Sequence, residues 1–199
     1  TANRLRAVFR IDLEQSIKVW DRCVASGLEG KEGFRKCLRL TLYRPRDLLI
    51  LLNDAFLRAS QQGRERIVLS DIESSAKAIS SHRLDDLRKE YTKALPGLPY
   101  LSQSLNGSDP SLLVSEAIEL LGAAPAKAEH DQAAQQYFTL TKSSETLLKD
   151  LYSVGLIGIK DRASGNYVFS HDGRDPQFSF RSDDTVLIHP CYWLALNVS

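Results

Sequence analysis

The amino-acid sequence predicts a mainly α-helical protein in two parts, a helical part followed by an α+β part. In the first hundred residues, apolar side chains recur at three- and four-residue spacing, which is typical of amphipathic helices. In the second hundred, helical patterns give way to short apolar runs at 156–159 and 167–169, joined by turn residues as in a β-hairpin. A proline- and glycine-rich stretch separates the parts, so we expect one domain over residues 1–100 and another over 109–199.

The overall composition is that of an ordinary soluble domain, with 43% hydrophobic and 26% charged residues in a chain of 199. No apolar run approaches the roughly 20 residues that a membrane helix needs, so we expect no membrane partner. The cysteines Cys23, Cys37 and Cys191 are far apart, which indicates free thiols and a cytoplasmic location. A chain that starts with threonine and contains no methionine is expected to be a piece of a longer protein.

The charge is unevenly distributed along the chain. Residues 1–100 hold 19 Lys and Arg against 13 Asp and Glu, a net charge of +6, whereas residues 101–199 hold 7 against 12, a net charge of −5. An acidic second half argues against a DNA-binding role, because affinity for duplex DNA comes mainly from basic side chains that neutralise phosphates. We therefore expect the second domain to bind protein in preference to DNA.

The most informative stretch is the helix predicted to start at Pro45. Proline suits the first turn of a helix, and Asp47 adds a negative charge there, which the helix dipole favours. The predicted core-facing residues share three- and four-residue spacing: Leu48, Leu51, Leu52, Ala55, Phe56 and Ala59. Arg46 is not explained by this pattern. A guanidinium beside the free N–H groups of a helix N-terminus is a place that attracts phosphate.

The same residues resemble the lid of bacterial AAA+ and STAND-like P-loop ATPases. The segment Arg44-Pro45-Arg46-Asp47-Leu48-Leu49 precedes a leucine-rich helix, and 67–72 leads into a second one, so that the similarity covers roughly residues 35–95. In such ATPases an arginine at the head of the first of these helices contacts the γ-phosphate of ATP. The resemblance places that role on Arg46, with Arg44 as the second candidate.

The second predicted lid helix follows residue 69. Ser70 and Glu73 have the spacing of a capping box. The apolar phase shifts between Ile79 and Leu84, which predicts a bend or break near residues 80–82.

In the second domain, a helix over 145–152 is followed by the hairpin of 156–169, after earlier helices. This order resembles a winged helix-turn-helix, which implies that the helix and the hairpin form a contact surface.

Motifs for catalysis or metal binding are missing from the sequence. A loop site formed by His171, Asp172 and Asp175 is weighed, but Gly173 and Pro176 favour a turn. The phosphate loop and the Mg²⁺-binding carboxylates of a P-loop ATPase are also missing. We therefore expect no catalytic residue, no metal site and no activity from this chain alone.

The sequence is thus interpreted as the C-terminal regulatory part of a P-loop ATPase, with a lid that senses ATP and a winged helix that mediates contacts. ATP and Mg²⁺ would be cofactors of the intact parent, not of this chain. The partners implied are the N-terminal nucleotide-binding domain of the parent and a protein bound by the winged helix. The parent is compatible with an oligomer. Two alternatives stay open. One is a DNA-binding winged-helix regulator that uses no nucleotide, and the other is a protein-interaction module.

Overall fold

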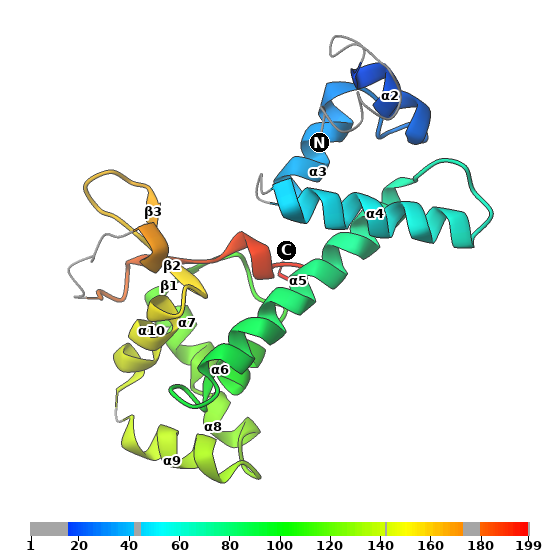
Figure 1. Ribbon diagram of the computed structural model, residues 1–199. Helices are drawn as coiled ribbons and strands as arrows, with labels where there is room; N and C mark the ends of the chain where they lie inside the picture. Colours follow the sequence, from blue (N-terminus) through cyan, green and yellow to red (C-terminus); the bar gives the residue numbers. More distant parts are fainter. Residues whose placement is uncertain (1–15, 42–44, 142, 173–179, 199) are drawn as a thin grey trace. The chain divides into compact units, whose positions relative to one another are not determined.

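The computed structural model of this chain describes residues 16–41, 45–141, 143–172 and 180–198. The chain divides into two compact units, Thr1–Ser80 (unit 1) and Ser81–Ser199 (unit 2). Within the described ranges, unit 1 is helical, and unit 2 combines helices with a small four-stranded antiparallel sheet (Figure 1). This architecture confirms the predicted fold class of a helical domain followed by an α+β region.

The helices of unit 1 are α2 (Ser16–Cys23), α3 (Gly30–Leu40), α4 (Pro45–Gln61) and the first part of α5 (Leu69–Tyr91). They enclose one hydrophobic core, whose buried members are Trp20, Val24, Leu28, Cys37, Leu48, Leu51, Ala55, Ile67, Ile72 and Ala76. The Trp20 indole N–H donates to the Leu28 carbonyl at 2.6 Å, and its ring meets Phe34 edge-on at 5.4 Å. This tryptophan therefore ties α2 to the turn before α3 and to α3 itself.

Helix α4 begins at Pro45, as its sequence predicts, and buries Leu48, Leu51 and Ala55. Phe56 departs from the prediction, because 40% of its surface is exposed on the opposite side of the helix. Five consecutive apolar residues, 48–52, make the helix apolar on several sides, so spacing alone does not identify the buried side.

The connection from α4 to α5 is held by a buried extended contact and an ion pair. Val24 and Ile67 form a parallel β-bridge, and neither side chain is exposed. The Arg64 guanidinium donates to both carboxylate oxygens of Asp71 at 2.6 and 2.8 Å, and the Val68 N–H donates to Asp71 at 3.0 Å. Arg64 lowers the pKa of the buried Asp71 carboxyl. The acid that closes the first turn of α5 is thus Asp71, two residues earlier than the predicted Glu73.

Helix α5 runs without interruption from Leu69 to Tyr91, so the predicted break at residues 80–82 is absent. Ser80 is only 5% exposed and lies between the buried Ala76 and Leu84 at four-residue spacing. When this serine is counted as a core residue, the buried stripe continues in phase. The apolar phase shifts between Ile79 and Leu84 only when Ser80 is counted as a surface residue because it is polar.

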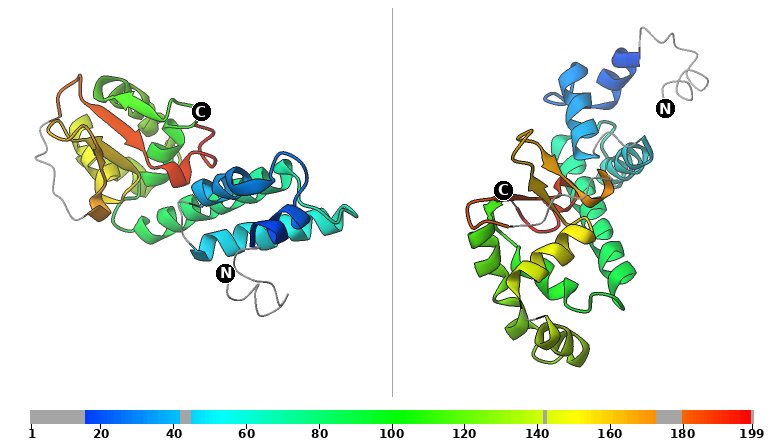
Figure 2. Two further views of the ribbon diagram at one scale, coloured as in Figure 1. Left: turned by 90° about the horizontal axis from the view of Figure 1, so that it is seen from above. Right: turned by 90° about the vertical axis from the view of Figure 1, so that its left-hand side faces the viewer.

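Unit 2 contains the rest of α5 and a set of shorter elements. The helices are α6 (Leu98–Ser104), α7 (Val114–Leu121), α8 (Ala124–Lys127), α9 (Gln132–Leu140) and α10 (Ser144–Ser153), with 3-10 turns η2 (Ser170–Asp172) and η3 (Pro190–Tyr192). The strands are β1 (Ser111–Leu113), β2 (Ile157–Lys160), β3 (Tyr167–Val168) and β4 (Thr185–Ile188). Helices α8 and α9 lie at the end of this unit away from the turn between β2 and β3 (Figures 1 and 2).

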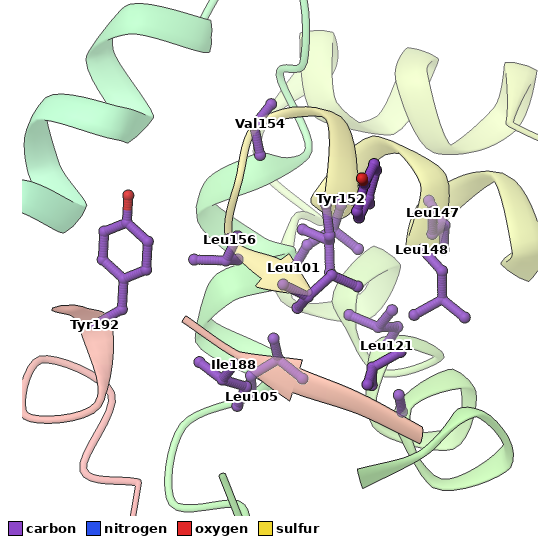
Figure 3. Packing of buried hydrophobic residues seen from close by; sticks show 14 of the residues in the cluster. Leu101, Leu105, Leu121, Leu147, Leu148, Tyr152, Val154, Leu156, Ile188 and Tyr192 are labelled. Carbon is purple, nitrogen blue, oxygen red and sulfur yellow. The ribbon is translucent and has the colours of Figure 1, made fainter. Parts of the chain in front are cut away.

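The strand order in the sheet is β1-β4-β2-β3, and all pairs are antiparallel. The register pairs Leu112 with Val186 and Ile159 with both Val186 and Val168, so these buried residues meet on neighbouring strands. The core beneath the sheet gathers side chains from α6, α7, α10 and β4, among them Leu101, Leu105, Leu121, Leu147, Leu148 and Ile188 (Figure 3).

The boundary between the units differs from the one expected between residues 100 and 109. Leu95, Leu98, Leu101 and Leu105 belong to the same buried cluster as Leu112, so the proline- and glycine-rich stretch lies inside unit 2. Gly97 is buried there, and an added Cβ would come within 2.4 Å of the Tyr137 ring. Glycine serves close packing at this point, and the sequence alone suggested a linker.

Helix α9 is tied to α10 by one short hydrogen bond. The Tyr137 hydroxyl donates to Asp150 Oδ2 at 2.6 Å, between half-buried side chains. Burial, together with this bond to a carboxylate, raises the pKa of Tyr137 well above its ordinary value. The orientation of α10 in unit 2 therefore depends partly on a polar contact outside the hydrophobic core.

The first prediction concerns Asp71. Replacing it by asparagine removes a buried charge that Arg64 and Val68 stabilise, so Asp71→Asn should lower the free energy of opening of unit 1 by about 1–3 kcal/mol at neutral pH. Because the folded pKa is lowered, this stabilisation is present above the unfolded pKa of about 4 and disappears as the pH falls through the folded pKa. Native-state hydrogen exchange of α4 and α5 amides measures the difference.

Glu32→Gln is the matched control, since Glu32 pairs with Arg35 at 2.6 Å but both side chains are more than half exposed. An exposed pair contributes little, so this change should cost less than about 0.5 kcal/mol. Equal effects of the two substitutions, or an Asp71→Asn effect that persists at about pH 2, would contradict this account.

The second prediction tests the tie between α9 and α10. Tyr137→Phe should lower the free energy of opening of these helices by about 1–2 kcal/mol, because a half-buried carboxylate loses its donor. Hydrogen exchange of the α9 and α10 amides reports the change. Tyr167→Phe is the control, since the Tyr167 hydroxyl bonds the exposed Ser111 hydroxyl at 2.7 Å, and water can replace that bond. Equal losses in the two variants would refute the assigned role.

Candidate functional site

The first part of the candidate site is the head of α4. Arg46 lies in the first helical turn, directly after Pro45, and its side chain is exposed. Across the described ranges, no hydrogen bond or ion pair joins its guanidinium to another residue. The backbone N–H groups of a first helical turn lack partners within the helix. Arg46 therefore combines an exposed positive charge with the positive end of the helix dipole, and this combination can attract a phosphate or a carboxylate.

The second predicted residue, Arg44, lies outside the described residues. The preceding helix α3 brings three further basic side chains into this part of unit 1. Arg35 pairs with Glu32 at 2.6 Å and Lys36 with Glu73 at 3.6 Å, whereas Arg39 in the last turn is exposed. Among these cations, two are partly neutralised by neighbouring carboxylates. Of these four cations, Arg39 and Arg46 are the two that make no ion pair within the described residues.

A second feature is the side of α4 that faces away from the core. Four large apolar side chains are exposed there: Leu49 (37%), Ile50 (45%), Phe56 (40%) and Leu57 (56%). Asn53 lies between the two pairs at helical spacing and is also exposed. We refer to Arg46, Leu49, Ile50, Asn53, Phe56, Leu57 and Ser60 as the outer face of α4. An apolar patch of this kind, rimmed by polar residues, is typical of an interaction surface.

The third feature is the surface of unit 2 formed by α10 and the β2–β3 hairpin. The cations here are largely paired. Lys149 contacts Glu145 at 2.9 Å, and Arg162 makes a bidentate pair with Asp184, with Nε 2.7 Å from Oδ1. This pairing lowers the pKa of Asp184. Lys160 is exposed at the end of β2, beside the turn at Asp161. The described surface therefore offers little free positive charge.

A cavity of about 480 Å³ opens between α5, α6, α8 and the C-terminal segment of unit 2. Arg88 lines it, with its guanidinium held by the Ser102 hydroxyl at 2.9 and 3.1 Å, and burial lowers the pKa of Arg88. Asp85 lies 3.6 Å from Arg88, and Lys127 reaches the Gln103 carbonyl at 3.4 Å. The sequence does not predict this polar cavity, because the residues that line it come from four separate segments and form no motif.

In the portion of the chain that the structure describes, no group of three or more His, Cys, Asp or Glu side chains is arranged to hold a metal ion. The weighed site at His171 and Asp172 would need Asp175, which lies outside the described residues. Likewise, none of the described helices has the length and apolarity required to cross a bilayer.

Comparison with known proteins relates the chain to longer ones. A family model described as "FunZ-associated C-terminal helical domain" matches residues 1–88, which include all of unit 1 and end inside α5. The chain is 43% identical over 201 residues to an 80.3 kDa protein assigned to transposon gamma-delta in Escherichia coli (strain K12). It is also 44% identical over 123 residues to the Allergen Alt a 2 of Alternaria alternata. No solved structure gives a significant match.

The extent of these matches differs between the two relatives. The gamma-delta protein matches 100% of this chain, which spans only 29% of that protein. The match to the Alternaria allergen covers 62% of this chain and 65% of the allergen. Together with the family description, these matches fit a C-terminal domain of a larger protein.

Proposed function

We propose that this chain is the C-terminal regulatory part of a larger protein that carries a P-loop ATPase domain. Unit 1 would be its lid, with Arg46 approaching the γ-phosphate of ATP, and unit 2 would be a winged-helix-like module that contacts protein. Support comes from the lid-like sequence around Pro45 and from relatives in which the chain corresponds to part of a longer protein. The free thiols of Cys23 and Cys37 are in keeping with a cytoplasmic location.

The observation that carries the proposal is the position of Arg46. The guanidinium is exposed at the first turn of a helix whose other side is anchored by Leu48, Leu51 and Ala55 in the core of unit 1. A side chain that contacts a phosphate needs a backbone held in place by packing and a charged group that is accessible. Arg46 meets both conditions. ATP and Mg²⁺ would bind to the N-terminal nucleotide-binding domain, which is the first partner of this chain. Arg44 remains the second candidate for the same role.

For unit 2, the order of elements supports a winged-helix-like module. Strand β1 precedes α7, and α10 leads directly into the β2–β3 hairpin, while β1, β4 and β2 lie side by side. In such modules the helix before the hairpin commonly contacts DNA. Here Lys149 and Arg162 are paired with carboxylates, which favours a protein ligand. One alternative is a DNA-binding winged-helix regulator that uses no nucleotide. The other is a protein-interaction module in which the helices of unit 1 only pack against a partner protein.

The third prediction tests Arg46 in the full-length protein. Arg46→Ala should reduce ATP hydrolysis by about ten- to a hundred-fold, because a charge-assisted contact to the phosphate is lost. Steady-state phosphate release measures the rate, and thermal unfolding verifies the fold. Arg66→Ala is the matched control, since Arg66 is an exposed arginine beyond the opposite end of α4. An unchanged rate in Arg46→Ala, or a full-length protein that does not hydrolyse ATP, would refute the proposal.

The fourth prediction separates protein binding from DNA binding. Fluorescence anisotropy with a labelled duplex at about 50 mM salt should show no association at micromolar chain concentrations, because few phosphates can be neutralised. Association that weakens steeply as salt rises would instead favour the DNA-binding alternative. In that case Lys160→Glu should abolish it, since Lys160 is the exposed cation beside the hairpin turn.

A further inference from the structure

The outer face of α4 has a regular spacing that the core of unit 1 does not require. Leu49 and Phe56 are seven residues apart, and so are Ile50 and Leu57. All four are at least 37% exposed, so this repeat is presented to solvent by the described part of unit 1. Seven-residue repeats of apolar residues on one side of a helix are the pattern by which two helices pack side by side. The outer face therefore fits a partner helix.

The same face is symmetric about its centre. The residues three and four positions before Asn53, at 49 and 50, are apolar, and so are those three and four positions after it, at 56 and 57. The residues seven positions away in each direction, Arg46 and Ser60, are polar. Reversing the direction of the helix leaves this pattern of polarity unchanged. A two-fold dimer interface must be complementary to itself, so such a pattern is what an antiparallel pair of identical helices needs. A different partner would not require this symmetry.

We propose that the outer face of α4 binds the same face of a second copy of this chain, with the two α4 helices antiparallel and the two-fold axis at Asn53. In this arrangement Leu49 packs against Leu57 of the second copy, and Ile50 packs against its Phe56. The amide side chains of the two Asn53 residues meet at the centre. A central asparagine pair satisfies its own hydrogen bonds and selects the register, which apolar residues alone would leave open.

The pairing leaves the head of α4 accessible. Arg46 comes opposite Ser60 of the second copy, at the rim of the interface. With a rise of 1.5 Å per residue, the two Arg46 residues would be about 21 Å apart along the helix axes. The N-terminal N–H groups point along the helix axis and not into the interface. Dimer formation is therefore compatible with the proposed role of Arg46, and it does not rest on that role.

The first test measures self-association of the 199-residue chain. Four half-exposed side chains make a small interface, so we expect a monomer–dimer equilibrium with a dissociation constant on the order of 10 micromolar. Sedimentation velocity across this range should show a species of 22.3 kDa converting to one of twice that mass. Leu57→Asp should weaken the association by about ten-fold or more, because it places a carboxylate in an apolar contact.

Leu140→Asp is the control, because Leu140 is 72% exposed but belongs to unit 2. It should leave the dissociation constant unchanged, and circular dichroism verifies that both variants keep their helices. A chain that stays monomeric throughout, or a dimer that Leu57→Asp leaves intact, would overturn the proposal. Either result would leave the ATP-sensing role of Arg46 to be judged by its own hydrolysis test.

The second test examines the antiparallel register. Asn53→Cys places one thiol of each copy at the two-fold axis, so mild oxidation should give a covalent dimer. Ser74→Cys introduces an exposed thiol on α5 of the same unit and should give no more covalent dimer than the natural chain, whose own cysteines set the background. Equal cross-linking of the two variants would refute the contact at Asn53, even where the chain dimerises by another surface.

Discussion

Both hydrophobic cores of this protein are built on one helix. The first part of α5 contributes Ile72 and Ala76 to the core of unit 1, and the second part contributes Leu84 and Leu87 to the core of unit 2. Ser80 lies in the same buried stripe between them. One stripe of side chains is buried along the whole of α5. A break in the helix near residue 80 would therefore expose both backbone polar groups and apolar side chains. Each unit depends on this helix for part of its core.

Charged side chains are used differently in the two units. In unit 1 the buried Asp71 is held by Arg64 and orders the entry to α5, while Arg46 at the head of α4 is left exposed. In unit 2 the pairs Lys149–Glu145 and Arg162–Asp184 neutralise cations on the surface where a winged helix would contact DNA. The net charges of +6 and −5 for the two halves already indicate this contrast. The proposed functions therefore separate along the chain, with anion recognition in unit 1 and protein contact in unit 2.

Much of the secondary structure could be predicted, and the exceptions have physical causes. Pro45 indicates the start of α4, and the turn residues between the apolar runs 156–159 and 167–169 indicate the β2–β3 hairpin. The side of α4 that is buried could not be predicted, because residues 48–52 are all apolar and define no phase. The composition around Gly97 indicates a linker, because it does not reveal that the Tyr137 ring packs against this glycine. The same limit applies to the site. Arg46 was found from its neighbours in sequence, whereas the cavity at Arg88 and Lys127 has no sequence pattern.

By itself, the sequence indicated the main helices and the β2–β3 hairpin, where charge accumulates, and that Arg46 stands at a helix N-terminus. These properties depend on neighbouring residues, through dihedral preferences, spacing and local hydrogen bonds. Only the tertiary structure decided where one unit ends, that Ser80 is a core residue, and that Leu49, Ile50, Phe56 and Leu57 remain exposed. Burial depends on which distant segments pack together, and a one-dimensional pattern cannot distinguish an apolar side chain that finds such a partner within the chain from one that does not.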